Sequence, residues 1–169
     1  MTIERGVIMQ YTIRKADLQD LPRIEQIYEF ARGFMARNGN PTQWGSTEPP
    51  HDLLVQDIHQ QRLYILLEND MIHGVFYYFL GNDPTYEIIY DGSWRSCAPY
   101  GTIHRIASDG SGGILKAAVA FCVGQCRHLR MDTHEDNRVM QSALGKLGFH
   151  RCGTIICDDG TPRIAYDLI

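Results

Sequence analysis

The sequence of 169 residues lacks a long apolar run, a cluster of basic residues and an even number of cysteines. Its longest apolar runs, such as residues 117–123, are far shorter than the roughly 20 residues that cross a bilayer. The 16 basic and 20 acidic residues give a net charge of −4, which argues against nucleic-acid binding. Five cysteines without a secretory signal predict free thiols and a cytoplasmic protein.

The length corresponds to about one domain, since a domain averages roughly 150 residues. The composition is 44% hydrophobic and 21% charged, which excludes a disordered or fibrous protein and favours one packed core. We expect residues 1–9 to be a loose leader and residues 10–169 to form the domain.

Hydrophobic spacing and turn residues predict an alternation of strands and helices. The expected strands are 10–14, 63–67, 73–80, 86–90, 100–107, 129–132, 152–157 and 163–168. The expected helices are 21–35, 51–60, 114–126 and 135–147. This order indicates one mixed α/β domain around a central sheet.

The most distinctive local feature is a glycine-rich loop at residues 108–113, between an expected strand and an apolar helix. Such a turn exposes backbone N–H groups at the positive end of a helix, which suits a pyrophosphate. No Gly-Lys-Ser/Thr follows, so it is not a Walker loop, and the Rossmann spacing is absent. Alone, the loop is equally consistent with a turn that binds nothing.

The residues after this loop resemble the GNAT family of N-acetyltransferases. The positions that fit the family's motif are Asn137, Leu144, Gly148 and Phe149. Residues 13–24 also look like the first strand and helix of the family, so the resemblance covers nearly the whole chain from residue 10. It implies an α/β (α+β) fold whose central sheet is mixed, mostly antiparallel and flanked by about four helices.

The resemblance implies acetyl-coenzyme A as co-substrate, a primary amine as acceptor and no metal. It assigns the backbone N–H groups of Ile106, Ala107 and Ser108 to the pantetheine arm and the thioester carbonyl. The residues expected at the pyrophosphate are Gly110, Ser111, Gly112, Gly113 and Ile114. Asn137 would bind the pantetheine arm, and the alternative is that it only caps its helix.

Two departures from the family pattern concern phosphate binding and the leaving group. Gly110 stands at a basic position of the family's loop, and the tyrosine that often protonates the leaving thiolate aligns with Gly145. These losses favour an alternative function, a non-catalytic module that binds or senses acyl-coenzyme A. A nucleotide-binding regulator is a further alternative, but the loop has no lysine to bind phosphate.

His104 is the candidate general base, because a histidine can accept a proton near neutral pH. Strand alternation places Thr102, His104 and Ile106 on one face of the expected strand, beside the thioester. The alternative is a structural histidine. On the acceptor side, Trp44 lies in a segment that lines the acceptor pocket in the family, and the alternative is a loop that one tryptophan anchors.

Tyr86 and Glu87 lie in an acidic, aromatic segment, residues 83–94, which would attract a cationic amine. A solvated hairpin is the alternative reading of this segment. The acceptor could be a small molecule or a peptide amine, and the sequence does not identify it. The family often dimerises, so a homodimer is one alternative for the oligomeric state.

Overall fold

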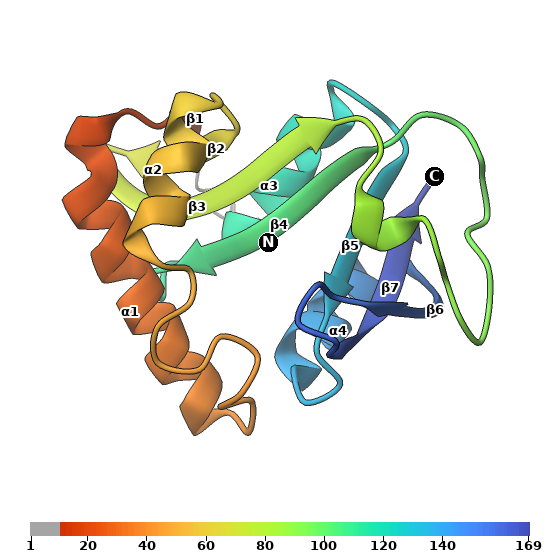
Figure 1. Cartoon of the computed structure of the whole chain (residues 1–169). Helices are drawn as coiled ribbons and strands as arrows, with labels where there is room; N and C mark the ends of the chain where they lie inside the picture. Colours follow the sequence, from red (N-terminus) through yellow and green to blue (C-terminus); the bar gives the residue numbers. More distant parts are fainter. Residues whose placement is uncertain (1–10) are drawn as a thin grey trace, which may run out of the picture.

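Seven strands and four α-helices alternate along residues 11–169, the part of the chain described by this computed structural model (Figure 1). They are β1 (Thr12–Lys15), α1 (Leu21–Arg37), α2 (His51–His59), β2 (Leu63–Glu68), β3 (Met71–Leu80), β4 (Gly101–Ser108), α3 (Ile114–Val123), β5 (Leu129–Thr133), α4 (Arg138–Lys146), β6 (His150–Ile156) and β7 (Pro162–Leu168). Short 3-10 helices, η1 (Leu18–Asp20) and η2 (Pro84–Tyr86), precede α1 and follow β3. The leader expected at residues 1–9 lies outside the described residues.

The strands form one sheet in the order β1-β2-β3-β4-β5-β7-β6. Every neighbouring pair is antiparallel except β4 and β5, which confirms the mixed, mostly antiparallel sheet. The parallel pairing is short: it joins Gly101 to Leu129 and Thr102 to Arg130. Beyond these residues β4 and β5 diverge, as Figure 1 shows. The sheet is therefore split between β4 and β5 beyond this short pairing.

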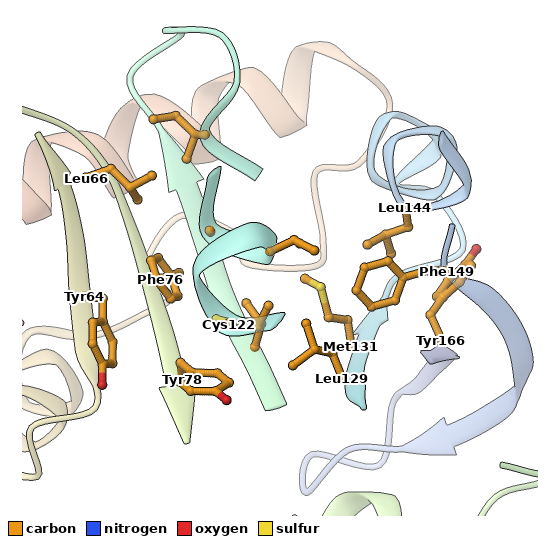
Figure 2. Close-up of a cluster of buried hydrophobic side chains, with 14 of the residues drawn as sticks. Tyr64, Leu66, Phe76, Tyr78, Cys122, Leu129, Met131, Leu144, Phe149 and Tyr166 are labelled. Atoms are coloured by element: carbon orange, nitrogen blue, oxygen red, sulfur yellow. The ribbon is translucent and has the colours of Figure 1, made fainter. Parts of the chain in front are cut away.

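Helices cover both faces of the sheet. On one face, α1 and α2 bury Ile24, Ile27 and Leu54 against β2 and β3. On the opposite face, Figure 2 shows Phe76 and Tyr78 of β3 beside Cys122 of α3, with a second group around α4 and β5. These helices hold the two halves of the sheet in place around the divergence of β4 and β5.

The expected hairpin between β2 and β3 is confirmed. Asn69 and Asp70 both adopt a left-handed conformation, with φ of 50° and 62°. Two consecutive left-handed residues are typical of a type I′ turn, and Asn and Asp tolerate them better than most residues. The turn thus sets the first pairs, Glu68 with Met71 and Leu67 with Ile72, and an irregularity beyond Leu67 shifts the register by one residue.

The prediction of a strand at residues 86–90 is wrong. Pro84 begins η2, and the Asp83 side chain caps it by accepting the N–H of Thr85. The chain then runs irregularly and makes only an isolated bridge between Tyr90 and Thr154. Capping by Asp and Pro outweighed the alternation of apolar residues, because both favour a helical turn at its start.

Two helix boundaries differ from expectation by three residues. Helix α3 ends at Val123 rather than at residue 126, and α4 begins at Arg138 rather than at residue 135. The later start follows from Asn137, whose side chain caps α4 by accepting the N–H of Met140. No helix within residues 11–169 has the length and apolar character needed to cross a bilayer.

Candidate functional site

A cavity of about 1210 Å³ lies where β4 and β5 diverge. Its walls come from α1, α2, the ends of β3 and β4, the glycine-rich loop, β5, α4 and the β6–β7 hairpin. The divergence leaves the edge of β4 beyond Thr102 without a partner strand on the β5 side. Backbone groups on such an edge can bind another extended chain.

A β-bulge in β4 shapes the inner wall of this cavity. Tyr77 pairs with His104, and Val75 pairs with Ala107. These pairs are two residues apart on β3 but three apart on β4, so β4 carries one extra residue. Arg105 adopts a φ of 51°, which is uncommon for a residue other than glycine. Bulges of this kind redirect side chains and often lie beside active sites.

Several contacts hold Arg105 in this conformation. The Tyr28 hydroxyl donates to the Arg105 carbonyl oxygen at 2.7 Å, and the guanidinium donates to Asp57 Oδ2 at 2.5 Å. Arg105 Cζ also lies 4.4 Å from the centre of the Tyr77 ring. Burial raises the pKa of Asp57, and the adjacent Arg105 offsets only part of that rise. The surrounding structure thus fixes the bulge, as a strained backbone requires.

The bulge corrects the expectation that Thr102, His104 and Ile106 share one face. His104 lies on the face of Tyr77, and their ring centroids are 6.2 Å apart. Ile106 instead packs on the opposite face, against the core formed with α3 and α4. The extra residue breaks the alternation between His104 and Ile106, and hydrophobic periodicity gives no sign of it.

His104 lies in the cavity wall between two carboxylates. Its Nε2 is 2.6 Å from Asp83 Oδ2, and its Nδ1 is 3.6 Å from Asp132 Oδ2. The buried Tyr86 hydroxyl donates to the same Asp132 oxygen at 2.7 Å. Asp83 lies in the loop between β3 and η2, His104 in β4 and Asp132 in β5, and the fold brings the three side chains together.

The protonation states of this group follow from its contacts. Burial raises the pKa of Asp83, but hydrogen bonds from His104 and Thr85 lower it more, to about 2. Burial and the nearby charge of Asp132 raise the pKa of Tyr86 well above its ordinary value. Asp83 is therefore an ionised acceptor near neutral pH and Tyr86 a protonated donor. A carboxylate paired with an imidazole can perform general-base chemistry.

The structure places the three expected acceptor residues differently. Trp44 lines the cavity and packs edge-on against Tyr28, with ring centroids 5.6 Å apart. Tyr86 is only 1% exposed and acts from behind the cavity wall through Asp132. Glu87 follows η2, is exposed and does not line the cavity. Of this set, Trp44 alone lies where an acceptor could touch it.

The glycine-rich loop is partly satisfied by its own side chains. The N–H of Gly110 donates to Ser108 Oγ and that of Ser111 to Asp109 Oδ1, both at 3.0 Å. The remaining N–H groups of the loop and the helix start, those of Gly112, Gly113 and Ile114, have no acceptor within residues 11–169. They stand at the start of the ten-residue helix α3, which favours an anion there.

The cofactor positions expected from the sequence lie in two groups. Those that line the cavity are Ile106, Ala107, Ser108, Gly110, Ser111, Ile114 and Asn137. Gly112 and Gly113 lie outside the cavity lining, although they belong to the same loop. Gly113 has a φ of 80° and forms the N-cap of α3, so glycine suits this position.

Asn137 makes two hydrogen bonds of different kinds. Its Oδ1 accepts the Met140 N–H at 3.1 Å and caps α4. Its Nδ2 donates to Gln43 Oε1 at 3.1 Å, which connects α4 with the loop after α1 across the cavity. Gln43 Oε1 also accepts from Asn40 Nδ2 at 2.8 Å. Asn137 is therefore a cap that also faces the cavity.

The alignment of the family tyrosine with Gly145 needs a correction. Counted seven residues on from Asn137, or four back from Gly148, the tyrosine of the motif falls on Leu144. Leu144 is fully buried in the core, and Gly145 is exposed on the far side of α4 from the cavity lining. Neither residue has a hydroxyl, so the lack of a proton donor at this position stands.

Sequence reasoning missed three members of the site, namely Asp57, Arg105 and Asp132. Asp132 ends an expected strand, and a carboxylate at a strand end is a recognisable signal. Asp57 lies on a helix face between apolar residues, where its burial is not apparent from the sequence. Within the described residues, no three His, Cys, Asp or Glu side chains are arranged to hold a metal ion.

The fold is similar to that of solved acetyltransferases. An acetyltransferase of the GNAT family from Streptococcus agalactiae is 30% identical, with 94% of this chain and 95% of that chain covered and a TM-score of 0.84. A ribosomal-protein-alanine N-acetyltransferase from Brucella melitensis shares the fold at 17% identity, covering 94% and 99% of the two chains, with a TM-score of 0.62.

An acetyltransferase from Salmonella typhimurium, solved with acetyl-CoA, shares the fold at 15% identity. It covers 94% of this chain and 92% of its own, with a TM-score of 0.58. No family model matches the chain. No curated protein matches it either.

Proposed function

This chain belongs to the GNAT family of acetyltransferases, and we propose that it transfers the acetyl group of acetyl-coenzyme A to a primary amine. The observation that best supports this is the cavity at the β4–β5 divergence, which holds a carboxylate-paired His104 beside an unpaired strand edge. Acylation of an amine needs a neutral amine, a polarised carbonyl and a protonated leaving thiolate. Two of these requirements have candidate groups in this cavity. His104 can take the proton that leaves the amine neutral, and backbone N–H groups on the free edge of β4 can polarise the carbonyl.

The unpaired edge of β4 fits the pantetheine arm. Strand pairing with β5 ends at Thr102, and Ile106, Ala107 and Ser108 continue along the cavity wall. Their backbone groups can bond the amides of pantetheine as those of a neighbouring strand would. An N–H on this edge can also polarise a thioester carbonyl. Bound acetyl-coenzyme A supplies the acetyl group in activated form.

The glycine-rich loop fits a pyrophosphate. The N–H groups of Gly112, Gly113 and Ile114 have no acceptor within residues 11–169. Asp109 is the acidic residue of the loop, and both Arg23 Nη2 and His73 Nδ1 contact its Oδ2, at 2.8 and 2.9 Å. Because these partners compensate its charge, Asp109 opposes anion binding less than a bare carboxylate would.

The cavity as a whole favours a cation. Its lining carries six carboxylates and three guanidinium groups, besides His104. The acidic members are Glu48, Asp57, Asp83, Asp132, Asp158 and Asp159, and the basic members are Arg62, Arg105 and Arg163. A cavity with an excess of negative charge attracts a protonated amine. The acceptor is therefore a small molecule or peptide that presents an ammonium group.

Changing Asn137 to Ala is expected to weaken coenzyme A binding severalfold and to lower the free energy of unfolding by about 1 kcal/mol. The stability loss follows from the lost cap on Met140, and the affinity loss from removing an amide that lines the cavity. Calorimetric titration with coenzyme A and urea unfolding measure the two effects.

Asn137→Ser is the matched control, because serine keeps a capping oxygen but has no amide. We expect it to retain the stability and to lose the affinity. Unchanged coenzyme A affinity in Asn137→Ala would contradict a cofactor role and leave only the cap.

Incubation with acetyl-coenzyme A and an amine tests the proposed function. The probes are spermidine, lysine and a peptide that begins with alanine, and release of free thiol is followed with a thiol reagent. We expect release above the amine-free rate with at least one probe, and mass spectrometry should show one added acetyl group. Coenzyme A binding without release for every amine would favour the non-catalytic alternative, and absence of binding would overturn both.

A further inference from the structure

The two ring nitrogens of His104 have unequal surroundings. Nε2 lies 2.6 Å from Asp83 Oδ2, which is hydrogen-bond distance, whereas Nδ1 lies 3.6 Å from Asp132 Oδ2, which is too far for one. An ionised carboxylate only accepts hydrogen bonds, so Asp83 holds the proton of the neutral ring on Nε2. The lone pair is then on Nδ1, the nitrogen that faces Asp132.

Asp132 is fixed from the opposite side. The hydroxyl of Tyr86 donates to Asp132 Oδ2 at 2.7 Å, and the Tyr86 ring is almost fully buried. Within residues 11–169, Asp132 Oδ1 has no hydrogen-bond donor, and the side chain lines the cavity. Asp132 thus offers an oxygen to the cavity, close to the unprotonated nitrogen of His104.

The charged groups around His104 leave the space between its Nδ1 and Asp132 negatively charged. The titratable and charged side chains that surround it are Asp57, Tyr77, Asp83, Tyr86, Arg105 and Asp132. The cation among them, Arg105, is paired with Asp57. Asp57 accepts from Arg105 and Asp83 from the ring N–H of His104, whereas within residues 11–169 Asp132 accepts only the hydroxyl of Tyr86.

We propose that the acceptor binds as a primary ammonium between Asp132 and Nδ1 of His104, with Asp83 as a positioning residue; this rests on the proposed acetyl transfer. One ammonium proton passes to Nδ1, and the imidazolium is held between Asp83 and Asp132. The amine lone pair then bonds to the thioester carbonyl carbon, the C–S bond breaks, and a second amine proton passes to the thiolate sulfur. The products are the amide and free coenzyme A, and His104 returns its proton to solvent.

This geometry selects a class of acceptor. An ammonium can donate one N–H to Asp132 and another to Nδ1, and after losing a proton it still donates to Asp132. A hydroxyl group carries no charge and has one donor, so it cannot satisfy both groups. The site therefore predicts N-acetylation of primary amines and no acetylation of the corresponding alcohols.

Asp132→Asn tests the ammonium contact. The change keeps the shape and an oxygen for Tyr86, but it removes the charge and presents an amide that donates. We expect the KM for the amine to rise about tenfold or more, because a charge-assisted hydrogen bond is lost, and the KM for acetyl-coenzyme A to stay within twofold. The probe is the best acceptor among spermidine, lysine and the alanine peptide.

Glu135→Gln is the matched control. Glu135 lies three residues after Asp132, is exposed and does not line the cavity, so its change removes the same charge outside the acceptor site. We expect the amine KM of this variant to stay within twofold of the parent. An equal rise in both variants would show a general effect of charge and overturn the contact with Asp132.

Nuclear magnetic resonance of 15N-labelled protein tests the positioning role of Asp83 without any substrate. Two-bond correlations report which imidazole nitrogen carries the proton in the neutral ring, and we expect Nε2. Asp83→Asn should lose this preference and lower kcat severalfold while the amine KM changes little. A neutral ring protonated on Nδ1 would overturn the inference.

The outcomes separate this inference from the proposed function. Transfer by Asp132→Asn with an unchanged amine KM would overturn the inference and leave acetyl transfer standing. Equal acetylation of propylamine and propanol would do the same. Absence of transfer to every amine by the parent protein, with Nε2 protonation intact, would overturn the proposed function and the ammonium site with it.

Discussion

Changing His104 to Gln is expected to lower the maximal rate of acetyl transfer by about a hundredfold or more, with little change in the affinity for acetyl-coenzyme A. The glutamine amide can still donate to Asp83, as His104 Nε2 does, but it cannot accept a proton from an amine. Thiol release at saturating acetyl-coenzyme A measures the rate, and calorimetric titration measures the affinity. The variant should also lose the limb of the pH–rate profile that reports the imidazole.

Tyr77→Phe is the matched control for packing, because it keeps the ring that lies against His104 and removes only the hydroxyl. We expect this variant to turn over at nearly the parental rate. A purely structural role for His104 predicts a lower melting temperature and an unchanged profile shape. Near-normal turnover by a folded His104→Gln protein would end the assignment of His104 as the base.

The order of elements was predictable because it depends on local signals. The periodic apolar residues of α1, the turn at residues 69–70 and the glycine-rich loop each act within a few residues, and each element formed near its expected place. The strand expected at residues 86–90 failed because a cap at Asp83 competed with apolar alternation. A cap also moved the start of α4: the side chain of Asn137 caps the helix, which begins at Arg138 rather than at residue 135.

The site was only partly predictable because its contacts join distant segments. His104 meets Asp83 across 21 residues and Asp132 across 28, and both approaches depend on strand register rather than on spacing in the sequence. The bulge at Arg105 is set by Tyr28 and Asp57, which belong to two helices on the same face of the sheet. Such contacts join segments that are far apart in the sequence, so no local pattern of residues predicts them.

Gly112→Pro is expected to weaken coenzyme A binding by more than tenfold, because it removes a backbone donor from the pyrophosphate position. The Gly112 N–H has no acceptor within residues 11–169, and a Cβ at this position would meet no atom within 4 Å. Proline therefore deletes the donor, and its Cβ enters open space. A hydrogen bond to a charged group contributes about 1.5–3 kcal/mol, which corresponds to more than a tenfold change in Kd.

The choice of Gly112 depends on its backbone. Gly110 and Gly113 have φ of 99° and 80°, values that proline cannot adopt, so proline there would strain the loop whether or not a ligand binds. Gly112 is outside that left-handed group. Gly112→Ala fills the same open space and keeps the N–H, so it should bind coenzyme A within twofold of the parent. Equal affinity of the Pro and Ala variants, both with parental melting temperatures, would place the pyrophosphate away from this N–H.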